Sequence, residues 1–141
     1  MSLRDDARHD SFWRHEWTKH GSCGRRSPSL ANQFLYFNTT LSLYDSFPLK
    51  DWLSRSDILA SNDRLFSVNH FHDAIEKHLK SRVRLECSLN RGPPEAQSPP
   101  ILAEIHICLD RKTLTPIDCQ KRDDRQCFSN SNKNLVLFPK H

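Results

Sequence analysis

The residues of this chain that could do chemistry are concentrated in one twelve-residue stretch, from Phe12 to Cys23. It reads Phe-Trp-Arg-His-Glu-Trp-Thr-Lys-His-Gly-Ser-Cys. Histidine exchanges a proton near neutral pH, glutamate carries negative charge and lysine carries positive charge. Together these groups suit a reaction in which a proton moves while negative charge builds up on oxygen. Phosphoryl transfer is such a reaction.

A helix over this stretch would place four of its polar side chains on one face. At about 100° per residue they lie at roughly 300°, 40°, 340° and 80° when Phe12 is set at zero. In chain order, these residues are His15, Glu16, Lys19 and His20. They form two pairs spaced four residues apart, so we expect two adjacent columns whose ends converge on one small ligand. We also expect Trp13 and Trp17 to flank this face and Gly21 to end the helix.

These residue types suggest a division of labour. His20 exchanges the proton, while Lys19 and protonated His15 stabilise a phosphorane and hold a phosphate. Glu16 steers its neighbours or the phosphoryl group. The alternative interpretation is a surface helix whose charges are only solvated.

The pattern F-W-x-H-E-W-x-K-H-G-[ST]-C, complete from Phe12 to Cys23, resembles the second active-site segment of the ribonuclease T2 family of secreted acid endoribonucleases. The resemblance implies that His20 is a catalytic histidine, that Glu16 and Lys19 stabilise the transition state, and that His15 helps to bind the phosphate. The family cleaves single-stranded RNA without metal or another cofactor. The 2′-hydroxyl attacks the adjacent phosphorus, expels the 5′-oxygen and leaves a 2′,3′-cyclic phosphate; DNA lacks that hydroxyl.

Family members also carry an earlier segment of the form W-P-x-x-x-x-x-H-G-L-W-P, with the second catalytic histidine and most of the base-binding aromatic residues. Nothing in this sequence matches it. We therefore interpret residues 1–11 as a polar N-terminal tail and residues 12–141 as a partial T2-like domain that lacks the N-terminal strands. The alternative function is a truncated, catalytically impaired relative that at most binds RNA or phosphate.

Composition sets broad limits on the fold and its partners. With 36% hydrophobic residues in 141, we expect one domain with a modest core. The net charge of +4, rising as the eight histidines are protonated, gives weak support for RNA binding. The N-terminal residues have no signal-peptide core, and no transmembrane run follows. The resemblance implies an extracellular, lysosomal or vacuolar monomer that binds single-stranded RNA and neither metal nor membrane.

The five cysteines fall into a cluster of four and an isolated one. The four allow three pairings, and the resemblance favours Cys108 with Cys119, nested inside Cys87 with Cys127. Such bridges imply an oxidising compartment; in the cytosol all five thiols would stay reduced. Cys23 matches a family cysteine whose partner lies upstream, so we expect it to be unpaired. The spacings fit no zinc site.

Hydrophobic periodicity predicts an α+β fold with helices packed on an antiparallel sheet. We expect helices over residues 30–47, 48–55 and about 67–80, strands over 83–87, 101–109, 114–118 and 135–138, and loops over 58–66, 90–100 and 120–133. Phe34 and Tyr36 are expected in the core, and His72 is expected to pair with Glu76. Histidines 70, 72 and 78 are interpreted as surface residues or as hydrogen-bonded structural residues. Asn38 begins a glycosylation sequon, which matters only if the chain is secreted.

Overall fold

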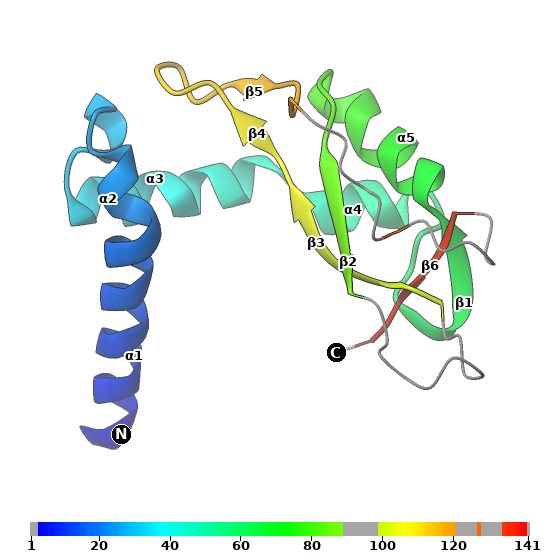
Figure 1. Cartoon of the computed structure of the whole chain (residues 1–141), viewed down its shortest axis with the longest axis horizontal. Helices are drawn as coiled ribbons and strands as arrows, with labels where there is room; N and C mark the ends of the chain where they lie inside the picture. Colours follow the sequence, from blue (N-terminus) through cyan, green and yellow to red (C-terminus); the bar gives the residue numbers. More distant parts are fainter. Residues whose placement is uncertain (1–2, 89–98, 121–126, 128–133, 141) are drawn as a thin grey trace. The chain divides into compact units, whose positions relative to one another are not determined.

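The structure is a computed structural model that describes residues 3–88, 99–120, 127 and 134–140. For residues 3–9 it describes the backbone only. The chain divides into two compact units, Met1–Pro48 and Leu49–His141. In the described ranges, the first unit contains helices alone and the second contains every strand (Figure 1). The predicted loops over residues 90–100 and 120–133 lie largely outside the described residues.

One nearly continuous helical segment begins the first unit. Helix α1 (Leu3–Glu16) runs directly into the π-helix η1 (Trp17–Gly21) and then into α2 (Ser22–Gly24). The predicted polar N-terminal tail is helical from Leu3 onward. One expectation is wrong, because Gly21 does not end the helix. Gly21 has φ −66° and ψ −35°, the right-handed conformation, whereas a C-terminal glycine stop needs the left-handed one.

Helix α3 (Gln33–Ser46) follows the 3₁₀ turn η2 (Pro28–Leu30). It begins where the Asn32 side chain accepts a hydrogen bond of 2.9 Å from the Leu35 backbone N–H. Two of its aromatic residues, Tyr36 and Phe37, pack edge-on against the first segment, and the ring centroids of Trp13 and Phe37 are 4.7 Å apart. The expected burial of Phe34 is wrong, since this residue is 76% exposed. The apolar residues of α3 surround the helix, so one contact face cannot cover them all.

The second unit is built around a four-stranded sheet in the order β1-β6-β3-β2. Its strands are β1 (Ser61–Ser67), β2 (Arg84–Ser88), β3 (Ile101–His106) and β6 (Leu135–Phe138). The β1/β6 and β2/β3 pairs are antiparallel, but β3 and β6 are parallel, with Ile101 opposite Leu137. The sheet is therefore mixed, which corrects the expected antiparallel sheet within a confirmed α+β fold.

Two strand predictions need correction. The predicted loop over residues 58–66 contains most of β1, an edge strand whose side chains are mostly exposed. Because only Phe66 on this strand is fully buried, the hydrophobic alternation that marks a half-buried strand is missing. The predicted strand over residues 101–109 is interrupted at Ile107. Beyond it, β4 (Cys108–Leu109) pairs with β5 (Pro116–Ile117) in a separate two-stranded sheet.

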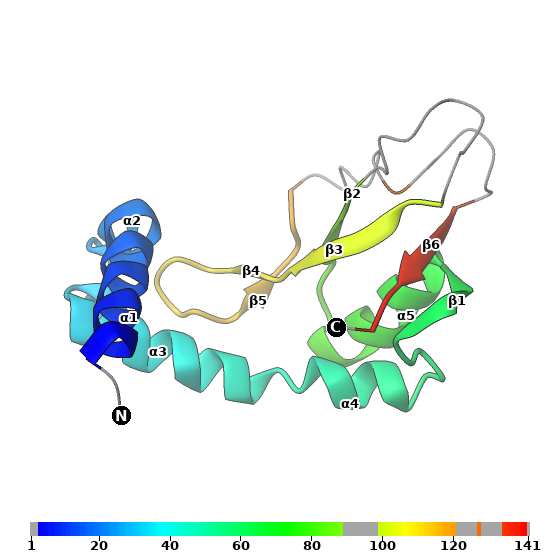
Figure 2. The ribbon, with the colours of Figure 1, turned by 90° about the horizontal axis from the view of Figure 1, so that it is seen from below.

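Helix α5 (Val68–Leu79) supplies much of the core, whereas α4 (Leu49–Ser54) buries only Leu53. Figure 2 shows α5 beside β1 and β6. Phe71 and Ile75 of α5 pack with Leu85 of β2 and Val136 of β6, and none of the four has measurable exposure. The core therefore joins residues that are distant in the sequence.

Polar contacts and disulfides complete the second unit. The predicted His72–Glu76 pair forms, with Nδ1 and Oε1 2.9 Å apart, and the same carboxylate accepts a hydrogen bond from the Val83 N–H. The bridges join Cys87 with Cys127 and Cys108 with Cys119, the pairs that the family resemblance implies. In the part of the chain that the structure describes, no helix is long and apolar enough to cross a membrane.

Replacing Ile75 by Ala should lower the free energy of unfolding by about 2–4 kcal/mol, because it leaves a cavity in a closed core. Urea denaturation followed by circular dichroism measures this loss. Leu59→Ala is the matched control: Leu59 is 54% exposed, so its truncation should change stability by less than about 0.5 kcal/mol. Equal losses for the two variants would contradict the assigned core.

Candidate active site

The four polar residues singled out in the sequence lie where α1 passes into η1. His15 and Glu16 end α1, whereas Lys19 and His20 belong to the π-helix. The Glu16 Oε2 and His20 Nε2 atoms are 4.0 Å apart, with side-chain exposures of 31% and 64%. One of the two expected columns is thus brought together, and its histidine is open to solvent.

The π-helix changes the geometry on which the sequence analysis relied. The Ser22 N–H donates to the Trp17 carbonyl five residues earlier, so this turn is wider than an α-helical one. Single π turns are rare in proteins and frequent at functional sites. The spacing of 100° per residue therefore does not hold from Trp17 to Gly21.

His15 and Lys19, the other expected column, line an open hollow of about 580 Å³. Its remaining lining residues are Asp10, Ser11, Arg14 and Thr18. Three of the six lining side chains are basic or can become so, against one carboxylate. Glu16 and His20 do not line this hollow. The four residues therefore do not converge on one hollow, although the sequence predicts that they do. The two columns face different surroundings.

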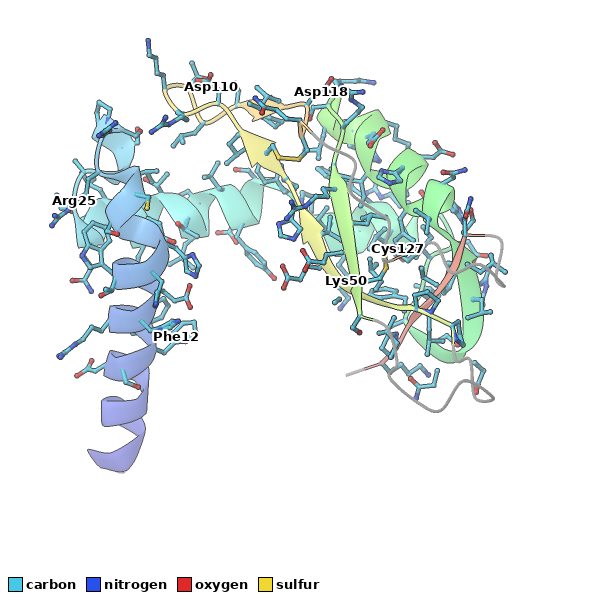
Figure 3. All side chains as sticks on the ribbon, in the orientation of Figure 1. Phe12, Arg25, Lys50, Asp110, Asp118 and Cys127 are labelled. Carbon is cyan, nitrogen blue, oxygen red and sulfur yellow. A yellow bond between two sulfur atoms is a disulfide. The ribbon has the colours of Figure 1, made fainter. Side chains whose placement is uncertain are left out.

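Trp17 fixes this turn by packing directly on Gly21. A Cβ atom built on Gly21 would overlap Cε3 of the indole and lie 2.9 Å from Cζ3, so only glycine fits here. The Arg25 guanidinium lies over the same indole, 5.4 Å from its centroid. Figure 3 labels Phe12 and Arg25 in the first unit. Trp17, the first residue of the π turn, thus contacts Gly21, its last residue.

Tyr36 of α3 is a neighbour of the site that the sequence analysis placed only in the core. Its ring meets the Trp17 indole edge-on at 5.7 Å. Partial burial raises the pKa of the Tyr36 phenol, and the negative charge of Glu16 raises it further. The phenol therefore lies within electrostatic reach of Glu16. No local pattern could have signalled this, because the two residues belong to different helices.

Among the described residues, one group has the ligand types and spacing for a metal ion: Glu86, Glu104 and His106 of the β2/β3 pair. Nε2 of His106 lies 3.3 Å from Glu86 Oε2 and 3.0 Å from Glu104 Oε2, and the Arg84 guanidinium lies 3.6 Å from Glu86 Oε2. The carboxylates thus already have cationic or hydrogen-bonding partners, and the group belongs to the second unit. Cys23, in the first unit, is exposed and unbridged.

Replacing Glu16 by Gln should lower the pKa of Tyr36, because the change removes a negative charge that opposes phenolate formation. The chain has two tyrosines, so a Tyr44→Phe background leaves Tyr36 as the only phenol. Alkaline titration of phenolate absorbance then gives the Tyr36 pKa with Glu16 or Gln at position 16. Identical titration curves would contradict the proximity of Glu16 and Tyr36.

Comparisons with known proteins identify the family of the chain. The model of the ribonuclease T2 family matches residues 1–119. Ribonuclease Oy of Magallana gigas is 31% identical over 122 residues, which are 86% of this chain and 55% of the relative. A ribonuclease-like storage protein of Panax ginseng is 31% identical over 79% of this chain and 43% of the relative.

The solved structure of human RNase T2 gives the same result for the fold. It superposes with a TM-score of 0.72 at 25% identity, covering 92% of this chain and 61% of that one. The chain spans about half the length of the curated relatives it matches. By the family model and these relatives, the chain belongs to the ribonuclease T2 family.

Proposed function

We propose that this chain supplies acid–base and phosphate-binding residues of a T2-type endoribonuclease. The reaction is metal-independent transphosphorylation of single-stranded RNA, leaving 2′,3′-cyclic phosphate ends. One observation carries the proposal: the exposed His20 imidazole, on the π turn, pairs with Glu16 at the end of α1. Family membership adds to it, since the twelve-residue stretch containing this pair lies within the matched region.

His20 is the proton-transfer residue in this proposal. In the reaction the 2′-hydroxyl loses its proton, a bond forms from the 2′-oxygen to phosphorus, the bond to the 5′-oxygen breaks, and that oxygen gains a proton. His20 performs one of the two proton transfers, and its exposure leaves the ring accessible to RNA. Glu16, 4.0 Å from the ring, orients the imidazole in this proposal.

His15 and Lys19 bind the phosphate in this proposal. Both line the open hollow together with Arg14. Cationic donors stabilise the negative charge that builds up on the non-bridging oxygens as phosphorus becomes pentacoordinate. Lys19 lines the same hollow as His15 and directly precedes His20 in the chain. It can therefore hold the phosphate close to the residue that transfers the proton.

The second candidate function is binding of RNA or phosphate without efficient turnover. One observation favours it: the Panax ginseng relative, which is 31% identical over 79% of this chain, is named a ribonuclease-like storage protein.

The proposed setting is an oxidising one, outside the cell or in a lysosome or vacuole. The two disulfides support it, because such bridges persist where thiols are oxidised. We further propose that the chain acts as a monomer, with single-stranded RNA as its partner.

Replacing His20 by Ala should reduce cleavage of single-stranded RNA by about 10²-fold or more, because one proton-transfer group is lost. The assay follows 2′,3′-cyclic phosphate ends between pH 4 and 8 in the presence of a chelator. His70→Ala is the control, since His70 lies in α5 of the second unit. Unchanged cleavage by the His20 variant would rule out the proposed role.

RNA binding separates the two candidate functions if the chain does not cleave. Fluorescence anisotropy with a short labelled oligonucleotide should show that Lys19→Ala weakens binding and flattens its salt dependence, because a phosphate contact is lost. Binding that depends on Lys19 without turnover supports the second candidate. Neither cleavage nor Lys19-dependent binding would reject both.

A further inference from the structure

Helix α3 carries an exposed apolar hollow that the ribonuclease proposal does not use. The hollow has a volume of about 550 Å³, and its lining residues are Gln33, Phe34, Phe37, Asn38 and Leu41. Phe34 is 76% exposed and Leu41 is 57% exposed. Large apolar side chains grouped on a surface commonly mark a place that something covers.

The position of Asn38 identifies a candidate cover. Phe34 precedes Asn38 by four residues and Leu41 follows it by three, so all three lie on one face of α3. The Asn38 side chain is exposed and lines the hollow itself. A group attached to its amide nitrogen would begin at the wall of the hollow and extend over the apolar side chains.

Asn38-Thr39-Thr40 is the one Asn-x-Ser/Thr triplet in the sequence, and its middle residue is not proline. The Thr39 hydroxyl donates to the Ser29 carbonyl and the Thr40 hydroxyl to the Tyr36 carbonyl, at 2.9 and 2.7 Å. These contacts hold both threonines against the backbone. The acceptor asparagine, in contrast, remains at the surface.

We propose that Asn38 carries an N-linked glycan whose first sugars cover the hollow between Phe34 and Leu41. The donor is an oligosaccharide on a polyprenyl diphosphate. A bond forms between Nδ2 of Asn38 and C1 of the first sugar, the bond from C1 to the diphosphate oxygen breaks, and Nδ2 loses one proton. The apolar face of a pyranose ring then buries part of the exposed aromatic and aliphatic surface.

This inference does not depend on ribonuclease activity. It requires only passage through a secretory compartment, which the formation of the two disulfides also favours. It assigns a second role to α3, which also packs Phe37 against Trp13 and Tyr36 against Trp17.

The modification is tested by directing the full chain into the secretory pathway of insect cells with a cleavable leader. Intact mass and sensitivity to peptide-N-glycosidase should show one glycan. Thr40→Ala should abolish it, while Thr40→Ser, which keeps the triplet and a hydroxyl, should retain it. A secreted wild-type chain without sugar would overturn the proposal.

The covering role is tested with the dye ANS, whose fluorescence rises on exposed apolar surface. The unglycosylated Thr40→Ala chain should enhance ANS fluorescence, and the glycosylated chain should lose most of that enhancement. Adding Phe34→Ser to Thr40→Ala should lower the signal again if the dye binds in the hollow. Equal ANS fluorescence of the glycosylated and unglycosylated chains would show that the sugars do not cover it.

Discussion

The first unit depends on the contact between the Trp17 indole and Gly21. The indole occupies the space that a Cβ atom at position 21 would need, and the same ring contacts Tyr36 on one edge and lies beneath Arg25. One side chain thus connects the π turn, the end of the helical segment and α3. Because His20 lies inside that turn and Glu16 directly precedes it, the position of the candidate acid–base pair follows from how Trp17 packs.

The spacing of the candidate site residues predicts their arrangement only in part. The Glu16–His20 pair follows from spacing of four residues, and the hollow lined by His15 and Lys19 agrees with a cationic column. The π turn could not be predicted, since a shift of one residue in the backbone hydrogen bonds leaves no pattern in polarity. Gly21 was misinterpreted for a related reason: glycine permits either a left-handed stop or a close approach, and the indole four residues earlier decides between them.

In the fold, too, local residue spacing predicts some elements, whereas others depend on contacts between distant segments. Helix α5 and strand β2 were predicted because their buried residues recur at helical and strand spacing. Strand β1 was missed because most of its side chains are exposed, so its strand character comes from pairing with β6 about 70 residues later. The parallel contact between β3 and β6 also joins distant segments. Such pairing is a property of the whole chain and cannot be found in one stretch.

The packing of Trp17 on Gly21 holds the π turn, and NMR of the indole N–H groups can test this contact. The chain has three tryptophans, so three resonances report on Trp13, Trp17 and Trp52. Gly21→Ala should shift the Trp17 resonance strongly and leave that of Trp52 in place, while the control Gly24→Ala, whose Cβ would meet only the flexible Leu30 side chain, should change Trp17 little. An unmoved Trp17 resonance in Gly21→Ala would contradict this account.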